Sequence, residues 1–123
     1  MEQDPRVWIN AVDDTIRECI AQVGGRKDEV AGIGVSGQQH GLVALNKETE
    51  VIRPAKLWCD TSTAAECDEI TAKLGGPKKT ITALGNAVLP GFTASKILWL
   101  KKHEPKNFAR LDCVCLLYTS RCV

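Results

Sequence analysis

The strongest constraint on the fold of this chain is a change in hydrophobic periodicity at Gly24-Gly25. Before these glycines, apolar side chains recur every three or four residues from Trp8 to Val23, which predicts an amphipathic helix that starts after Asp4-Pro5. After them, residues 30–35 form a short apolar run that contains glycine and is typical of a strand buried on both faces. A helix followed by such a strand indicates an α/β fold.

Several later segments also have the composition of regular structure. Residues 42–45 and 51–52 are β-prone and flank a polar connection, which predicts a hairpin or near-hairpin. Cap-forming residues at 60–63, with Glu66 three positions after Thr63, predict a helix that opens with a capping box and stops at residues 75–77.

The second half of the chain is expected to continue this alternation. The pattern predicts a further helical turn within residues 78–86 and a helix that Thr93 caps and Glu104-Pro105 ends. A short helical turn and a buried strand over residues 112–117 should follow.

Composition excludes several classes of function. The 123 residues include 16 basic and 15 acidic side chains, and a net charge of +1 provides no basic surface for nucleic acid. The longest uncharged stretch, residues 30–46, is interrupted by polar side chains and does not resemble a membrane span. The first residues lack the apolar core of a secretory signal, so we expect a cytoplasmic protein of one modest domain, or a piece of a larger one.

The cysteines and histidines do not predict a metal site. No two of the six cysteines have the C-x2-C spacing of structural zinc sites. His40 and His103 lie in unrelated sequence contexts. We therefore expect no metal ligands in this chain.

The polar loop at residues 36–41 is the most informative segment for function. It places Gln39 and His40 at the end of an expected buried strand, where ligands of open α/β sheets tend to bind. Their donors and acceptors suit a polyhydroxylated ligand, although a loop that bonds only to its own backbone would need the same residues. The Gly-x-Gly-x-x-Gly pattern at 32–37 does not predict a dinucleotide site, because its glycines lie inside the expected strand.

Trp58 and Asp60 allow two interpretations. The indole can lie against the apolar face of a sugar, with the carboxylate nearby. Alternatively, Trp58 is a buried aromatic side chain and Asp60 caps the following helix. Both can hold together, and the residues alone indicate no more than a site for a polar small molecule.

Four segments resemble the motifs of the FGGY carbohydrate kinases. They are Ser-Gly-Gln-Gln-His-Gly-Leu-Val at 36–43, Arg-Pro-Ala-Lys-Leu-Trp-Cys-Asp at 53–60, Ala-Ala-Glu-Cys at 64–67 and Gly-Asn-x-x-Leu-Pro-Gly-Phe-Thr-Ala-Ser-Lys-Ile-Leu-Trp at 85–99. Their order and spacing agree with the family from about residue 2 to residue 114. Residues 1–114 are therefore similar to part of the N-terminal, sugar-binding domain of these kinases.

The resemblance implies an α/β fold that is a partial actin-like, ribonuclease-H-like domain, with a mixed sheet flanked by helices. It also implies an enzyme that uses ATP and Mg²⁺ to phosphorylate the 5-hydroxyl of D-xylulose, with no nucleic-acid or membrane partner. Its substrate-binding positions are Gln39, His40, Trp58 and Asp60, and Gly91 and Phe92 form a wall of the pocket.

The same resemblance implies parts that lie outside this chain. The family's opening strand pair, with its Asp-Gly-Thr phosphate loop, would precede Met1, and the catalytic aspartate and the ATP-binding domain would follow residue 123. We therefore expect no catalytic residue in this chain and no activity of the chain alone. Residues 115–123 resemble a translated sequencing adapter and are predicted to be a non-native tail.

Two alternatives stay open. Relatives often have Trp-Asn-Asp-x-Arg where this chain has Trp58-Cys59-Asp60-Thr61-Ser62, so the substrate can be another polyol or sugar, such as glycerol, ribulose or gluconate. His40 beside Gln39 favours the pentulose. A chain that keeps the loop without the transfer machinery would instead be a non-catalytic sugar-binding protein. The sequence makes no prediction of the oligomeric state.

Overall fold

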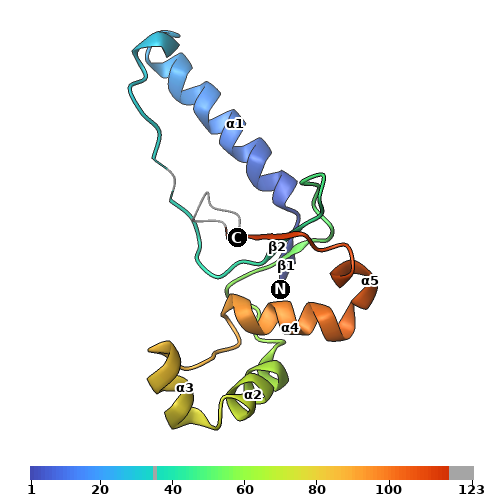
Figure 1. Cartoon of the computed structure of the whole chain (residues 1–123). Coiled ribbons are helices and arrows are strands. Elements are labelled where there is room, and N and C mark those ends of the chain that lie inside the picture. Colours follow the sequence, from blue (N-terminus) through green and yellow to red (C-terminus); the bar gives the residue numbers. More distant parts are fainter. Residues whose placement is uncertain (35, 117–123) are drawn as a thin grey trace.

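The computed structural model describes residues 1–34 and 36–116, which form helices and short strands (Figure 1). In chain order the elements are β1 (Glu2–Gln3), α1 (Pro5–Gln22), a 3-10 helix (Lys27–Glu29), β2 (Val43–Leu45), β3 (Ala55–Lys56), α2 (Ala64–Lys73), α3 (Pro77–Leu84), α4 (Thr93–His103), α5 (Pro105–Phe108) and β4 (Cys113–Cys115). The expected α/β class is confirmed. None of the described helices is long and apolar enough to cross a membrane.

Helix α1 has the start and the stop that the sequence predicts. The Asp4 side chain accepts a hydrogen bond from the Arg6 backbone N–H at 3.0 Å, and Pro5 occupies the first helical position. After the last turn, Gly24 and Gly25 have φ angles of 73° and 75°, a left-handed conformation that glycine adopts without steric cost.

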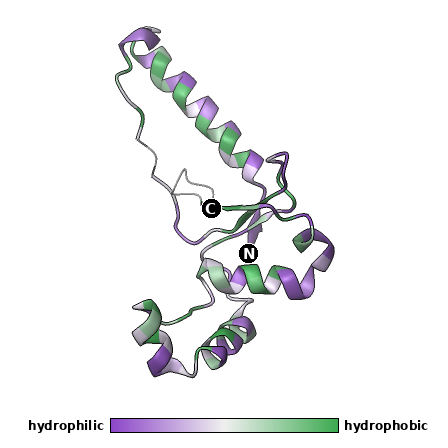
Figure 2. Ribbon diagram, viewed as in Figure 1, coloured by the Kyte–Doolittle hydropathy of each residue, from purple (hydrophilic) through white to green (hydrophobic). Residues whose placement is uncertain are grey.

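The strand expected at residues 30–35 is not formed over the described residues 30–34. This segment is extended and exposed, with Ile33 72% accessible, and Figure 1 shows it returning alongside α1. No strand of the described chain pairs with it, so its backbone has no ladder to join. Ile33 lines an open pocket together with Val12 and Ile16 of α1, a helix along which Figure 2 shows hydrophobic positions.

The described strands form two antiparallel pairs. Strand β1 pairs with β3, with Glu2 opposite Lys56, and β2 pairs with β4, with Ala44 opposite Val114. A bridge between Leu45 and Val51 closes the turn after β2, which confirms the near-hairpin. Strand β4 (Cys113–Cys115) confirms the strand expected within 112–117, but its residues are half-buried rather than buried, and residue 117 lies outside the described residues.

Helices α2 and α4 pack together, but neither has the cap that the sequence predicts. Thr63 stands at the N-cap of α2, but its hydroxyl accepts no hydrogen bond from the N–H groups of the helix and donates to the Pro90 carbonyl at 2.8 Å. Glu66, the expected partner in a capping box, is buried against Lys102, 3.3 Å away. Thr93 is the first residue of α4 rather than its cap. The two side chains of the expected capping box, Thr63 and Glu66, thus bond to tertiary partners.

Substitution of Leu100 tests the packing of α4 against α2. This leucine is fully buried on α4, so Leu100→Ala should lower the free energy of unfolding by about 2–5 kcal/mol through lost burial and a cavity. Leu84→Ala, at an exposed position of α3, should change it by less than about 0.5 kcal/mol. Denaturant unfolding followed by circular dichroism measures both values. Equal losses would show that α4 does not pack as described.

Candidate functional site

The loop at residues 36–41 and the segment after β3 enclose an open pocket of about 300 Å³. Four side chains line it, and we call it the Trp58 pocket: Gln38, Gln39, His40 and Trp58. The indole of Trp58 is 52% exposed, so its face is accessible to a ligand rather than buried in the core. The structure thus brings together three of the four substrate-binding residues that the sequence predicts.

His40 connects this pocket to the turn that precedes α4. Its backbone is in the left-handed region, with φ of 63°, and its imidazole ring faces Phe92. The two rings stack with centroids 4.5 Å apart and planes at 29°. Phe92, predicted as a pocket wall, therefore supports the imidazole from outside the set of lining residues.

Gly91 does not line the pocket but lies against the backbone of Trp58, which does. A Cβ atom at position 91 would lie 2.7 Å from the Trp58 carbonyl oxygen, which is closer than a real Cβ contact. Only glycine therefore allows the turn to approach the Trp58 segment this closely. Of the two predicted wall residues, Gly91 thus contacts the backbone of Trp58, and Phe92 contacts the ring of His40.

Lys96 is the residue that the sequence reading missed. It is fully buried, and its ammonium donates to the His40 carbonyl at 2.7 Å and to the Gly91 carbonyl at 2.6 Å. Burial lowers the pKa of Lys96 to about 8, although the negative charge of Asp60 opposes this shift. A lysine within a helical pattern is usually interpreted as solvent-exposed, so the one sequence signal that could have identified it is its place in the Gly-Phe-Thr-Ala-Ser-Lys motif.

Three buried side chains hold consecutive carbonyls of the turn before α4. Thr63 donates to Pro90 at 2.8 Å, Lys96 to Gly91, and Ser95 to Phe92 at 3.0 Å. Each of the three donors has no exposed surface. Because buried carbonyls without partners are costly, these bonds fix the turn in one conformation.

Asp60 does not line the Trp58 pocket. Its carboxylate is 3% exposed, accepts hydrogen bonds from Ser62 and from the amino group of Met1, and lies 3.5 Å from the Lys56 ammonium. Burial alone would raise the pKa of Asp60, but the hydrogen bonds and the positive charge of Lys56 hold it well below its ordinary value. In this structure Asp60 therefore fixes the segment that follows Trp58.

A cluster of charges lies beneath this segment. Arg53 pairs with Glu2 at 2.6 Å and with Glu104 at 2.9 Å, and Lys56 pairs with Glu2 at 3.3 Å. The Lys56 ammonium also lies 3.8 Å from the ring centroid of Trp99, within the range of a cation–π contact. These pairs connect β1, β3 and α4 below the pocket.

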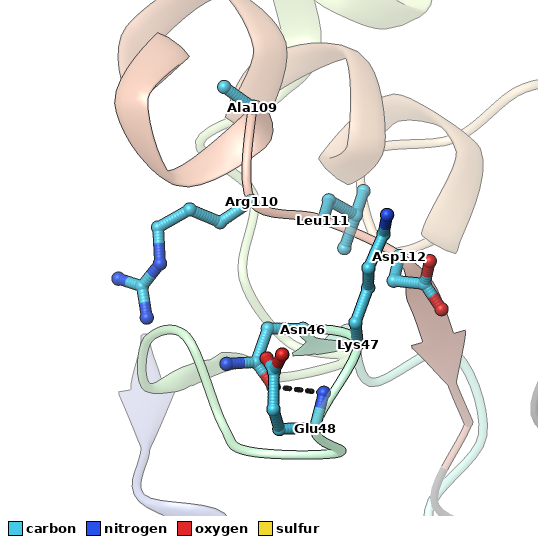
Figure 3. Close-up of a pocket in the computed structure, with 7 residues that line it drawn as sticks. All are labelled: Asn46, Lys47, Glu48, Ala109, Arg110, Leu111 and Asp112. Atoms are coloured by element: carbon cyan, nitrogen blue, oxygen red, sulfur yellow. Dashed lines mark hydrogen bonds between the residues drawn. The ribbon is translucent and has the colours of Figure 1, made fainter.

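A second pocket of about 260 Å³ lies between the turn after β2 and the segment before β4 (Figure 3). Its side chains include two of each charge, Lys47 and Arg110 with Glu48 and Asp112. Among the residues that line this pocket, Figure 3 shows a hydrogen bond from the Glu48 N–H to the Asn46 side chain, at 3.1 Å. It contains no predicted site residue and no aromatic surface, so the Trp58 pocket is the candidate site.

The side chains of the Trp58 pocket suit a ligand with several hydroxyl groups. Glutamine amides and a neutral imidazole both donate and accept hydrogen bonds, and an exposed indole face packs against C–H groups. Within residues 1–34 and 36–116, no three His, Cys, Asp or Glu side chains are grouped to hold a metal ion.

Residues 1–120 match the FGGY family of carbohydrate kinases, N-terminal domain. The fold and the pocket thus define a sugar-kinase domain, and the chain belongs to the FGGY family. Among solved structures, a Brucella ovis protein titled "xyloylose kinase" matches 95% of this chain with a TM-score of 0.86 and 38% identity. A xylulose kinase from Rhodospirillum rubrum matches 95% with a TM-score of 0.88 and 26% identity. The expected actin-like, ribonuclease-H-like fold is confirmed.

The curated relatives are much longer than this chain. The xylulose kinase of Haemophilus influenzae is 41% identical over 114 residues, which cover 89% of this chain and 23% of that protein. The chain likewise spans 24% of both the Brucella and the Rhodospirillum proteins. It thus corresponds to about a quarter of these kinases.

Gly91→Ala tests the close approach of the turn to Trp58. The added Cβ must displace the Trp58 carbonyl, so we expect a loss of about 1–3 kcal/mol in the free energy of unfolding. Gly32→Ala is the matched control, because a Cβ there meets no atom within 4 Å. Denaturant unfolding of both variants measures the difference. Equal stabilities of the two variants would contradict the contact.

The pH dependence of stability tests the burial of Lys96. Its pKa is about 8 in the folded chain and near the ordinary 10.5 in the unfolded chain, so the unfolded chain holds more protons between these values. The free energy of unfolding, relative to that of Lys96→Met, should therefore rise as the pH increases from about 8 to 10.5. Denaturant midpoints across this window measure it, with Lys101→Met, at an exposed position, as the control. A constant difference would exclude the shift.

Proposed function

We propose that the protein containing this chain is an ATP-dependent xylulose kinase, which transfers the γ-phosphoryl group of ATP to the 5-hydroxyl of D-xylulose. The observation that carries the proposal is the Trp58 pocket, where Gln39, His40 and Trp58 converge on one open surface. Support also comes from the relatives, since the proteins of Haemophilus influenzae and Rhodospirillum rubrum are both named xylulose kinases.

In this proposal the chain binds the sugar and positions it. Trp58 packs against the C–H face of the sugar, and Gln39 and His40 bind its hydroxyl groups. The sequence predicts Asp60 as a further sugar ligand, but Ser62 and Lys56 already surround its carboxylate. We therefore assign Asp60 to holding Trp58 in place, one step away from the substrate.

The phosphoryl transfer itself needs groups that we propose lie outside residues 1–123. ATP supplies the phosphoryl group, and Mg²⁺ neutralises the charge that develops on its oxygens. A catalytic aspartate accepts the proton of the sugar hydroxyl. Asp60 and Glu66 are unsuited to this role, because neighbouring donors lower the pKa of each carboxyl and make it a weak base.

Other expectations stay predictions. They are the extent of the native domain, residues 1–114, the non-native origin of residues 115–123, and a cytoplasmic location. Residues 117–123 lie outside the described residues. Sequencing the gene from a template without adapters decides the origin of the tail, because a genomic sequence that encodes it in frame removes the adapter interpretation.

Turnover by the protein expressed from the complete gene tests the function. We expect ATP-dependent phosphorylation of D-xylulose with a higher kcat/KM than for D-ribulose, glycerol or D-gluconate. A preference for one of those substrates would replace the pentulose by that substrate. Sugar binding without turnover would favour the non-catalytic sugar-binding protein.

Two variants test the pocket. His40→Ala and Trp58→Ala should each raise the KM for D-xylulose about tenfold, because the sugar loses a polar or an apolar partner, while the KM for ATP changes by less than about twofold. His103→Ala is the control, since the second histidine lies against Trp99 and outside the pocket. An unchanged KM for D-xylulose in both pocket variants would place the sugar elsewhere.

A further inference from the structure

We infer that Lys96 is a positioning residue for the sugar site, which cross-links the His40 loop to the Gly91 turn and so sets the shape of the Trp58 pocket. The inference rests on the proposed function for its link to sugar affinity. Its geometric part, the cross-link itself, stands on the structure alone.

The cross-link joins two segments that are far apart in sequence. The Lys96 ammonium bonds the carbonyl of His40, 56 residues earlier in the chain, and the carbonyl of Gly91, within the turn before its own helix. Thr63 and Ser95 also bond carbonyls of this turn, but the bonds that they make do not reach the His40 loop. Among these three buried donors, Lys96 alone bonds both the His40 loop and the Gly91 turn, which we call the two walls of the pocket.

The bonded atoms lie next to the groups that shape the pocket. The carbonyl of His40 belongs to the residue whose ring lines the pocket and stacks on Phe92 at 4.5 Å. The carbonyl of Gly91 belongs to the residue that approaches the Trp58 backbone. A displacement of the ammonium therefore moves the imidazole relative to the indole, which are the two rings on the pocket surface.

A cation is suited to this position because the carbonyls to be joined are both acceptors. Two carbonyls cannot hydrogen-bond each other, so a donor must stand between them. An ammonium has three N–H groups, and its bonds to carbonyls are stronger than those of a neutral donor. The left-handed backbone of His40, with φ of 63°, is sterically costly and needs such an external restraint.

Histidine NMR tests the cross-link without any ligand. The chain has two histidines, and each ring stacks on another aromatic ring, His40 on Phe92 and His103 on Trp99. In Lys96→Met we expect the ring-current shift of the His40 C–H signals to collapse toward the random-coil value, while the His103 signals stay in place. Lys101→Met, an exposed position of the same helix, should leave both sets unchanged. Retention of the His40 shift in Lys96→Met would overturn the proposal.

A variant that fails to fold would move the signals of both histidines, so the unmutated chain provides a second measurement. Scalar couplings across hydrogen bonds, from ¹⁵N of the Lys96 ammonium to the carbonyl ¹³C of His40 and Gly91, report the two bonds directly. Couplings to both carbonyls support the cross-link. Absence of either coupling, or His40 signals at random-coil positions in the unmutated chain, overturns it.

Kinetics of the protein from the complete gene test the link to sugar affinity. Lys96→Met should raise the KM for D-xylulose by about tenfold or more, with less than about twofold change in the KM for ATP. Equal changes in both constants would indicate a merely structural role and overturn the positioning role. If the unmutated protein does not use D-xylulose, the proposed function fails, whereas the NMR result still decides whether Lys96 joins the two walls.

Discussion

The buried ammonium of Lys96 is the interaction on which the geometry of the site depends. Burial of a charge is unfavourable unless hydrogen bonds replace its hydration, and here two carbonyls at 2.6 and 2.7 Å do so. Those carbonyls come from the His40 loop and the Gly91 turn, so the bonds that stabilise the charge also fix the distance between the pocket walls. The lowered pKa of Lys96, about 8, shows that the compensation is incomplete.

The same balance between burial and pairing extends below the pocket. Arg53, Lys56 and Glu66 are buried, and each has a partner of opposite charge. Such pairs contribute little net stability, but the removal of one member leaves an uncompensated charge, so they restrict the chain to conformations that keep them paired. Within the described part of the chain, the apolar core contains few large side chains, among them Leu42 and Leu100. Directional contacts therefore determine the arrangement around the pocket.

The features that could be predicted from the sequence are those determined by residues close to one another along the chain. Asp4-Pro5 and Gly24-Gly25 act on neighbouring backbone, and the start and stop of α1 are as predicted. The strand expected at 30–35 depends on a partner strand, and none of the described strands pairs with residues 30–34. Thr63 suits a local cap, but its hydroxyl bonds a carbonyl 27 residues away. Lys96 was missed for the same reason, because both of its acceptors are defined only by the folded chain.

The open shape of the Trp58 pocket limits how much of the surface of a bound sugar its residues could contact. A site that retains a small polar ligand usually covers most of its surface. The Trp58 pocket is open and has four lining side chains, so one face of a sugar can rest on the indole while the opposite face stays in contact with water. If the protein phosphorylates a sugar as proposed, tight binding then requires a second surface to close over the sugar and exclude water from the reacting hydroxyl. Under the proposed function, residues 36–60 and the turn before α4 would select and orient the substrate, whereas closure of the opposite face would supply much of the affinity.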